Sequence, residues 1–342
     1  MSLQRSGTRL WGGRHVTTMA QVAARAGVST ATVSRALRGM QVRPELAEAV
    51  KRAAAELDYS LDRTARSLRR GCSDIVALVV PDIENPFFTA LTRGVEDVAQ
   101  RAGLSVVLCN SDDDPLKEER YLSIADSENM AGVILAPASP RPRLDRLIAR
   151  ERAVVVLDRP VADDVDQVCF DNVELGREAT RALVEQGFHR IACVTGPERV
   201  RTARERATGW REVLAQAGLE RSRDLLVHSD YRVDGGRSAM QRLLRSDPVP
   251  EAVLATNNLV AVGILQVLDE TRGSRPEVGV GLIGDLPFAT VGIDGLTISP
   301  LRPRDLGTRG AEMFLERLKG LAGPGRHVVL PTERPSGRVA KI

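Results

Sequence analysis

The sequence predicts a small all-α head with a helix-turn-helix, followed by a larger α/β unit built from two doubly wound parallel-sheet lobes. Three observations lead to this fold class. A chain of 342 residues suits two or three compact units. Apolar residues recur at helical spacing near the N-terminus, and from Ile75 onward short apolar runs alternate with amphipathic helical segments. That alternation is typical of βαβ units and therefore of parallel sheets.

Three helices are expected in the head. Thr18 begins a T-x-x-Q motif, the spacing of a capping box, which predicts that the first helix starts here. Gly27 is expected to end that helix, and Ser29 can cap a second helix over residues 30–37. A third helix is expected to begin near Pro44, because proline in a first helical turn loses no hydrogen bond.

Eight short apolar runs predict the strands of the larger unit. Helical segments of ten or more residues separate them, as in sheets whose strands are buried on both faces. The runs fall into two groups of four, which indicates two lobes, with a ligand crevice at the carboxyl ends of the strands. The first group is IVALVV (75–80), LSVVLC (104–109), GVILA (132–136) and AVVVL (153–157), and the second is RIACV (190–194), LLVH (225–228), AVLAT (252–256) and VGVGLI (278–283).

Positive charge is concentrated near the N-terminus. The formal net charge is +3, but residues 1–71 hold thirteen Lys and Arg against five Asp and Glu, a charge of +8, so the remaining 271 residues sum to −5. Such a segment favours a polyanionic partner, since basic side chains release counterions from nucleic acid. A solvated basic tail is the alternative, and residues 1–16, rich in Gly and Arg, are expected to be a disordered basic extension. The folded pattern that follows favours nucleic acid.

The segment MAQVAARAGVSTATVSRAL (19–37) predicts how DNA is read. In a helix-turn-helix the second helix enters the major groove, where small and hydroxyl side chains allow close approach and an arginine can reach a guanine edge or a phosphate. An ordinary helical hairpin with a polar surface is the alternative. The DNA-contacting candidates in the head are Thr18, Ser29, Thr30, Ala31, Thr32, Ser34 and Arg35.

From Thr17 onward the chain resembles the lac-repressor (LacI) family of transcription regulators. The segment AGVSTATVSRAL (26–37) is similar to the recognition-helix signature of the family, and DYSLDRTARSLRRG (58–71) is similar to its linker. Further similar segments, in the same order along the chain as in the family, are VVPDIENPFFTALTRGVE (79–96), RTARERATGW (201–210) and ATNNLVAVGIL (255–265).

The resemblance implies a periplasmic-binding-protein-like sensor behind the head, and a hinge helix between them. That hinge helix would form on operator DNA between Asp62 and Arg69, with Ala65 and Leu68 facing the minor groove and Leu68 acting as an apolar wedge. The expected divisions are 17–58 for the head, 59–72 for the hinge linker, 73–170 with 297–325 for the N-terminal lobe, and 171–296 with 326–342 for the C-terminal lobe.

The resemblance also implies an effector site between the lobes. Charged and amide side chains would bond the hydroxyls of a polyol, and aromatic rings would cover its apolar face. Taken singly, each residue has a structural alternative: a carboxylate at a strand end can cap a turn, an arginine can pair with a carboxylate, and phenylalanines can be core. The candidates are Phe87, Phe88, Asp158, Arg159, Arg206, Tyr231 and Asn257.

Two positions depart from the family pattern. The chain has Asn258 where the family usually has Asp, and Gly284-Asp285 where the family tends to have two adjacent acids. The loss of an acid at Gly284 leaves fewer carboxylates for a sugar. We therefore expect weak sugar binding or a ligand such as a phosphorylated sugar, drawn to Arg159 and Arg206.

Neither a cofactor, a metal site nor a catalytic residue is expected. The GVGLIG segment (279–284) satisfies G-x-G-x-x-G, but its glycines lie inside an apparent strand, which argues against dinucleotide binding. Widely spaced cysteines form no CxxC pair and favour packing roles in a reduced compartment; they are Cys72, Cys109, Cys169 and Cys193. The chain has no apolar run of membrane-spanning length and no recognisable signal peptide, so a cytoplasmic location is expected.

The sequence therefore predicts a regulator, most simply a repressor, that binds a palindromic operator as a homodimer, with a tetramer as the alternative, and responds to a sugar or related metabolite. Two other classes share the α/β fold. A free-standing sugar-binding protein would lack the basic head. An enzyme acting on sugars or nucleosides would need a nucleophile or acid–base pair, and no motif nominates one.

Overall fold

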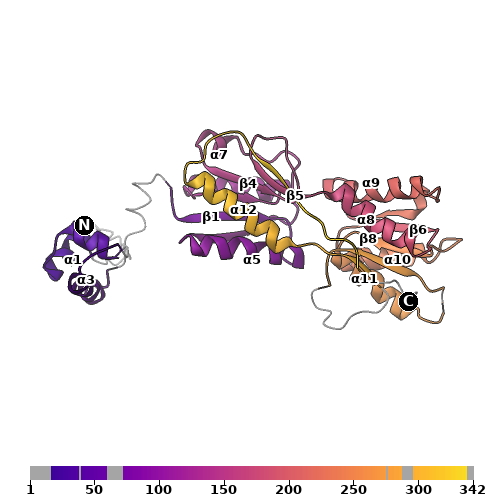
Figure 1. The fold of residues 1–342 in the computed structure, drawn as a ribbon, viewed down its shortest axis with the longest axis horizontal. Helices are drawn as coiled ribbons and strands as arrows, with labels where there is room; N and C mark the ends of the chain where they lie inside the picture. Colours follow the sequence, from indigo (N-terminus) through magenta and orange to yellow (C-terminus); the bar gives the residue numbers. More distant parts are fainter. Residues whose placement is uncertain (1–16, 38–39, 60–71, 275, 287–295, 337–342) are drawn as a thin grey trace, which may run out of the picture. The chain divides into compact units, whose positions relative to one another are not determined.

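The computed structural model describes residues 17–37, 40–59, 72–274, 276–286 and 296–336 (Figure 1). The chain separates into two compact units, residues 1–71 and 72–342, and the break lies next to the predicted end of the linker. We call them the head and the two-lobed unit.

The head contains the three predicted helices, α1 (Met19–Ala26), α2 (Thr30–Leu37) and α3 (Pro44–Glu56). The predicted capping box is present, because the Thr18 backbone N–H donates to Gln21 Oε1 at 2.7 Å and the Thr18 hydroxyl accepts from the Gln21 backbone. Gly27 ends α1 in the left-handed conformation, with φ +66°. Six side chains shared among the helices form a buried apolar core: Val22, Ala23, Val33, Val50, Ala53 and Ala54.

The first lobe is a six-stranded parallel sheet in the order β11-β5-β4-β3-β1-β2, covered by helices on both faces. The helices α5 and α12 pack together on one face, and α6 and α7 cover the other (Figure 1). Alternate strand residues enter the two cores: Val76 and Leu78 face one, Ala77 and Val79 the other. The elements are β1 (Ile75–Val80), α5 (Pro86–Arg101), β2 (Ser105–Asn110), α6 (Pro115–Ser127), β3 (Gly132–Leu135), α7 (Asp145–Ala149), β4 (Ala153–Leu157), β5 (Asp166–Phe170), α12 (Pro303–Leu318) and β11 (His327–Leu330).

The second lobe is a five-stranded parallel sheet in the order β10-β9-β8-β6-β7. Two helix pairs cover it, α8 with α9 and α10 with α11. The elements are α8 (Asn172–Glu185), β6 (Ile191–Thr195), α9 (Arg201–Gln216), the short 3₁₀ helix η1 (Arg223–Leu225), β7 (Leu226–His228), α10 (Val233–Leu243), β8 (Ala252–Ala255), α11 (Asn258–Glu270), β9 (Gly279–Ile283) and β10 (Leu296–Ser299).

All eight predicted strands are present within one residue of their expected ends, but three further strands, β5, β10 and β11, were not predicted. The expectation that the strands are buried on both faces is wrong for β2. This strand lies at the edge of the first sheet, and its Val107 and Leu108 side chains are exposed.

The expected lobe boundaries need correction at the C-terminal crossings. Residues 297–299 belong to β10, which pairs with β9 in the second sheet, although they were assigned to the first lobe. Residues 327–330 form β11, which pairs with β5 in the first sheet, although they were assigned to the second. The chain then returns to the second lobe, where Ser336 bridges Ile298. The chain therefore passes from the second lobe to the first between β10 and α12, and it returns to the second lobe after β11.

Candidate functional site

The N-terminal end of α2 is an exposed polar surface on the head. Ser29, Thr30 and Ala31 are exposed, and Thr32 and Ser34 are half-buried. The Ser29 hydroxyl caps the helix by accepting from the Thr32 backbone N–H at 3.1 Å, and it lies 2.9 Å from the Thr32 hydroxyl. Two of the predicted hydroxyls thus also organise the start of the helix.

Arg35, one turn further along α2, is exposed and forms no ion pair with any residue that the structure describes. Arg25 differs, because its guanidinium pairs with Glu56 on α3 at 2.6 Å. Arg35 is therefore the cation of α2 that is available for an external anion or a base edge.

A cavity of about 120 Å³ lies between the two lobes of the larger unit, and all seven predicted effector residues line it. The wall is built from strand ends, the loops that follow them and the N-terminal turns of α5, α9, α11 and α12, at the crevice predicted for doubly wound sheets. The lining residues are Asn85, Pro86, Phe87, Phe88, Ala90, Asp158, Arg159, Thr202, Arg206, Tyr231, Asn257, Asn258, Ile283, Gly284, Asp285, Leu301 and Pro303.

Asp158 follows β4 and is buried with an unusual backbone. Its φ of +66° is in the left-handed region, which a non-glycine residue adopts only when its surroundings enforce it. Burial raises the pKa of its carboxyl, although the nearby guanidinium groups of Arg159 and Arg206 oppose that rise. A carboxylate held in this way can accept hydrogen bonds from ligand hydroxyls.

Arg206 on α9 is buried and has two structural partners. Its Nε donates to Asn172 Oδ1 at 2.9 Å, and its Nη1 donates to the Thr256 carbonyl oxygen at 2.6 Å. The helix pair α8–α9 packs closely enough that a Cβ on Gly176 would lie 2.2 Å from the Arg206 carbonyl oxygen. Arg206 thus holds together α8, α9 and the end of β8 while its guanidinium faces the cavity.

Tyr231 lies in the loop between β7 and α10, also in the left-handed region, with φ +64°. The Asn257 Nδ2 donates to its carbonyl oxygen at 3.1 Å, and its ring packs on Gly196, where an added Cβ would lie 2.2 Å from the ring. The Tyr231 hydroxyl is buried and has no hydrogen-bond partner among the described residues. A buried orphan hydroxyl at a cavity wall is a ready partner for a polar ligand.

Arg159 and the aromatic residues complete the wall. The Arg159 Nη1 donates to Asp113 and to the Pro137 carbonyl oxygen, whereas its buried Nε has no hydrogen-bond partner among the described residues and lies 3.8 Å from Asp158 Oδ2. Phe87 and Phe88 form an edge-to-face pair with ring centroids 5.1 Å apart. The cavity therefore combines unpaired donors, a carboxylate and an apolar aromatic wall.

Comparison with known proteins identifies the fold and the family. Residues 73–318 match the family described as periplasmic binding proteins and sugar binding domain of LacI family, and residues 18–61 match the bacterial regulatory proteins of the lacI family. The chain belongs to the LacI family. Because its head matches the regulatory family, it is a DNA-binding transcriptional regulator.

Individual LacI-family proteins match along almost the whole chain. The ribose operon repressor of Halalkalibacterium halodurans is 33% identical over 308 residues, which cover 89% of this chain and 91% of that protein. The structure of a transcriptional regulator CelR–cellobiose complex is 31% identical, with a TM-score of 0.70, and the match covers 94% of this chain and 99% of that one. The structure of the lac repressor dimer bound to operator and the anti-inducer ONPF has a TM-score of 0.81 at 22% identity, covering 95% and 99%, and supports the fold.

The two departures from the LacI-family pattern both lie at the cavity. Asn258 is buried, and its Oδ1 accepts from the Leu259 backbone N–H at 2.9 Å, so it acts within the start of α11. Gly284 has a φ of +119°, a conformation that side chains other than glycine rarely adopt. Asp285 remains at the wall, and burial raises the pKa of its carboxyl, with a further increase from nearby Glu333.

The sequence did not nominate several lining residues. Asn85 and Thr202 lie within the segments 79–96 and 201–210 that resemble the family, and Asn85 is the N-cap of α5. Proximity in sequence to predicted residues is the signal that could have found them. The predicted hinge contacts Ala65 and Leu68 lie outside the described residues, as do residues 1–16.

No group of three or more His, Cys, Asp or Glu side chains within the described ranges is placed to hold a metal ion. None of the helices in the described part of the chain combines the length and apolarity required to cross a bilayer. The glycines of the G-x-G-x-x-G segment lie in and directly after β9, in agreement with the prediction that this segment is a strand.

Proposed function

We propose that this LacI-family regulator represses transcription from a palindromic operator as a homodimer, and that a sugar or related metabolite bound between the lobes changes its affinity for DNA. The observation that carries the proposal is the convergence of all seven predicted effector residues on one cavity, in a chain with a LacI-family head. The proposed site of action is the cytoplasm, where the operator is, and we propose no catalytic role.

The head supports major-groove reading by α2. The start of α2 is exposed and carries small side chains, those of Ser29, Thr30 and Ala31, which allow close approach to the bases. Arg35 is free to make a bidentate contact with guanine. Contacts to phosphates would come from the hydroxyls of Thr18, Thr32 and Ser34. Ala65 and Leu68 stay candidates for minor-groove contacts.

The first lobe offers a surface for a second copy of the chain. The edge strand β2 pairs with no strand of the described residues along its outer side, and Val107 and Leu108 are 39% and 45% exposed. Leu116 on the following helix, α6, is 76% exposed, and Ile124 further along α6 is also exposed. A two-fold axis through this surface would bury apolar side chains and give the dimer that a palindromic operator requires.

The charges at the cavity favour an uncharged polyhydroxyl ligand over a phosphorylated one. Two acids, Asp158 and Asp285, balance two arginines, Arg159 and Arg206. Arg159 is already paired with Asp113, and Arg206 donates a hydrogen bond to the Thr256 carbonyl oxygen. Neither guanidinium is therefore free of protein partners, as a phosphate-binding arginine would be. The relatives named as a ribose operon repressor and a CelR–cellobiose complex are consistent with a sugar.

Two measurements test the proposal. Fluorescence anisotropy of DNA from upstream of the chain's own gene should detect tight binding that weakens steeply with salt, because each neutralised phosphate contributes about −0.9 to the log–log slope. Calorimetric titration with neutral sugars, sugar phosphates and nucleosides should find a neutral sugar. If the protein binds DNA tightly but binds no compound of the panel, the proposed role of the cleft as an effector site is contradicted. A sugar that binds while DNA does not would favour a free-standing sugar-binding protein, and turnover of a ligand would favour an enzyme.

A further inference from the structure

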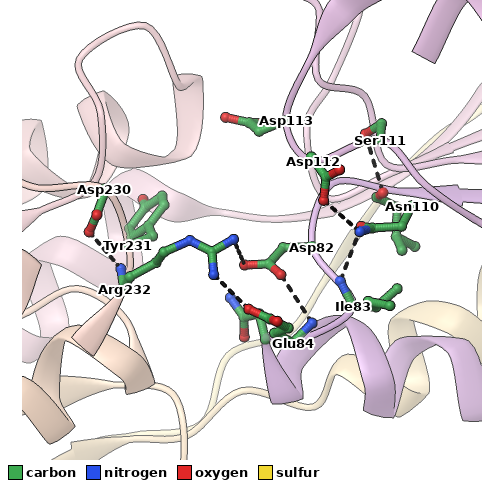
Figure 2. Close-up of polar contacts among 12 residues, drawn as sticks. Asp82, Ile83, Glu84, Asn110, Ser111, Asp112, Asp113, Asp230, Tyr231 and Arg232 are labelled. Atoms are coloured by element: carbon green, nitrogen blue, oxygen red, sulfur yellow. Dashed lines mark hydrogen bonds and ion pairs between the residues drawn. The ribbon is translucent and has the colours of Figure 1, made fainter. Parts of the chain in front are cut away.

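Two arginines of the second lobe form ion pairs with acids of the first lobe. Arg232, which precedes α10, places its Nη1 2.7 Å from Glu84 Oε2 and its Nη2 3.4 Å from Asp82 Oδ2 (Figure 2). Arg199, in the loop after β6, places its Nη2 2.7 Å from Asp113 Oδ2. Both contacts join segments that are far apart in sequence and belong to different sheets.

Both ion pairs are connected to residues that line the cavity. Arg232 follows Tyr231, and Glu84 precedes Asn85, both of which line the cavity. The carboxylate of Asp113 accepts from Arg199 of the second lobe and from Arg159, a lining residue of the first. If one lobe moved away from the other, these ion pairs would therefore break and the two sides of the cavity would separate at the same time.

The loops that carry the charges are held by local hydrogen bonds. The Glu84 backbone N–H donates to Asp82 Oδ1 at 3.0 Å, and the Arg232 backbone N–H donates to Asp230 Oδ1 at 2.9 Å. The Ile83 backbone N–H donates to Asn110 Oδ1 at 3.2 Å, which fixes this loop to the end of β2 (Figure 2). Because both sides are held in place, less side-chain and loop entropy is lost when the pair forms.

We propose that the pairs Arg232–Glu84 and Arg199–Asp113 form an ionic latch that holds the cleft closed in the absence of ligand. Arg232, Glu84 and Arg199 have partly or largely exposed side chains, so the latch is screened by salt. On the proposed function, the latch raises effector affinity by increasing the population of the closed, binding-competent form. None of these four residues needs to touch the ligand, so they act as positioning residues.

The latch can be tested in the full-length protein without ligand or DNA. Spin labels at Gln100→Cys on α5 and Arg245→Cys after α10 report the distance between the lobes, in a chain with Cys72 and Cys169 changed to Ser. Cys109 and Cys193 are buried and stay unlabelled. Diluting labelled chains with an excess of unlabelled ones restricts the signal to one chain in any oligomer.

The expected result is a dominant short distance at about 0.1 M salt, where the Debye length is about 10 Å, and a longer population at about 1 M, where it is about 3 Å. Arg232→Gln should lower the closed-to-open ratio about twofold to fivefold, the range for partly exposed pairs. Glu84→Gln should lower the ratio by a smaller factor, because Arg232 keeps its contact with Asp82, and should have no further effect in the Arg232→Gln chain.

Arg237→Gln is the matched control. Arg237 lies on α10, directly after the loop that carries Arg232, but its bidentate partner is Glu270 on α11 of the same lobe, so its loss should leave the interlobe distance unchanged. Equal distances in wild type and Arg232→Gln at both salt concentrations would overturn the latch, as would an Arg237→Gln effect of equal size. This experiment contains no ligand. Failure to find an effector would therefore contradict the proposed function but would not change the outcome of the latch experiment.

Discussion

The side chain of Asn257 joins the start of α11 to the loop that carries Tyr231. Its Nδ2 donates to the Tyr231 carbonyl oxygen at 3.1 Å, and its Oδ1 accepts from the Val260 backbone N–H at 2.9 Å. The sequence nominated Asn257 as a ligand contact, and the structure shows that both ends of its amide hold protein groups. Its effect on a ligand therefore passes through Tyr231 as well as through its own position at the cavity.

Asn257→Asp and Asn257→Ala separate these two roles. The Asp variant keeps a good N-cap but turns a carboxylate towards the Tyr231 carbonyl oxygen, so we expect some loss of stability from this repulsion and weakened sugar binding. The Ala variant loses the cap as well, and its unfolding free energy should fall by about 1 kcal/mol. Urea unfolding and calorimetry measure the two effects. Unchanged sugar binding in the Asp variant would show that sugar affinity does not depend on the hydrogen bond from Asn257 to the Tyr231 carbonyl oxygen.

Arg206→Ala is expected to destabilise the protein in addition to weakening the site. The change leaves the Thr256 carbonyl oxygen and Asn172 Oδ1 without this donor and removes one of the two cations near buried Asp158, so the unfolding free energy should fall by about 3 kcal/mol. Arg201→Ala on the same helix removes an exposed pair with Glu205 and should cost less than about 1 kcal/mol. Equal losses in the two variants would contradict the structural role assigned to Arg206.

Much of the fold followed from sequence because its signals are local. The capping box at Thr18, the left-handed Gly27 and the eight apolar runs each depend on residues within a few positions of one another. The cavity residues were nominated from the family resemblance, and their convergence follows from the rule that carboxyl ends of parallel strands meet at one edge.

The unpredicted elements depend on partners that are distant in sequence. Strand β5 contains buried Asp166, which is tolerated because Arg317 and Arg326 pair with its carboxylate at 2.7 and 2.6 Å. Burial opposes ionisation there, but the hydrogen bonds from both arginines hold the pKa of Asp166 below its usual range. Strand β10 contains buried Thr297, whose hydroxyl accepts from Gln186 at 2.8 Å. No local pattern reveals these partners.

Arg35→Ala tests whether α2 reads the bases, and Arg25→Ala, which removes the same charge from α1, is the control. Loss of a bidentate base contact is worth roughly 1–3 kcal/mol, so operator affinity should fall about tenfold or more. Arg25→Ala removes the same charge from the head, but its guanidinium pairs with Glu56, so we expect a smaller loss that is equal for operator and random DNA. Competition anisotropy with both DNAs measures this, and a uniform loss for Arg35→Ala would place that residue at a phosphate.

Glu118 should make stability depend on pH. It is buried, and burial raises its pKa to about 7 although the Ala138 and Ser139 backbone N–H groups donate to it. Between its ordinary value of 4.5 and about 7 the folded state binds more protons than the unfolded state, so this contribution to stability decreases as pH rises through that window, by up to about 3 kcal/mol.

Urea unfolding from pH 5 to pH 8 compares the wild type with Glu118→Gln, in which this component of the pH dependence should be lost. Glu119→Gln is the neighbouring control, since Glu119 is half-exposed and pairs with Arg143 on the surface. If the wild type and Glu118→Gln show the same change of stability with pH, Glu118 is not the group that titrates.

Whether one protein links operator binding to sugar binding is measured by the coupling between the operator and the sugar selected by titration. Operator affinity is measured by anisotropy with and without saturating sugar, and sugar affinity by calorimetry with and without operator. If one ligand-responsive protein links the two sites, both ratios must be equal, with a coupling of typically about 1–3 kcal/mol. Asp158→Asn, which alters the cavity and not the head, should abolish sugar binding and leave operator affinity at its sugar-free value. An operator affinity that the bound sugar does not change would contradict the account.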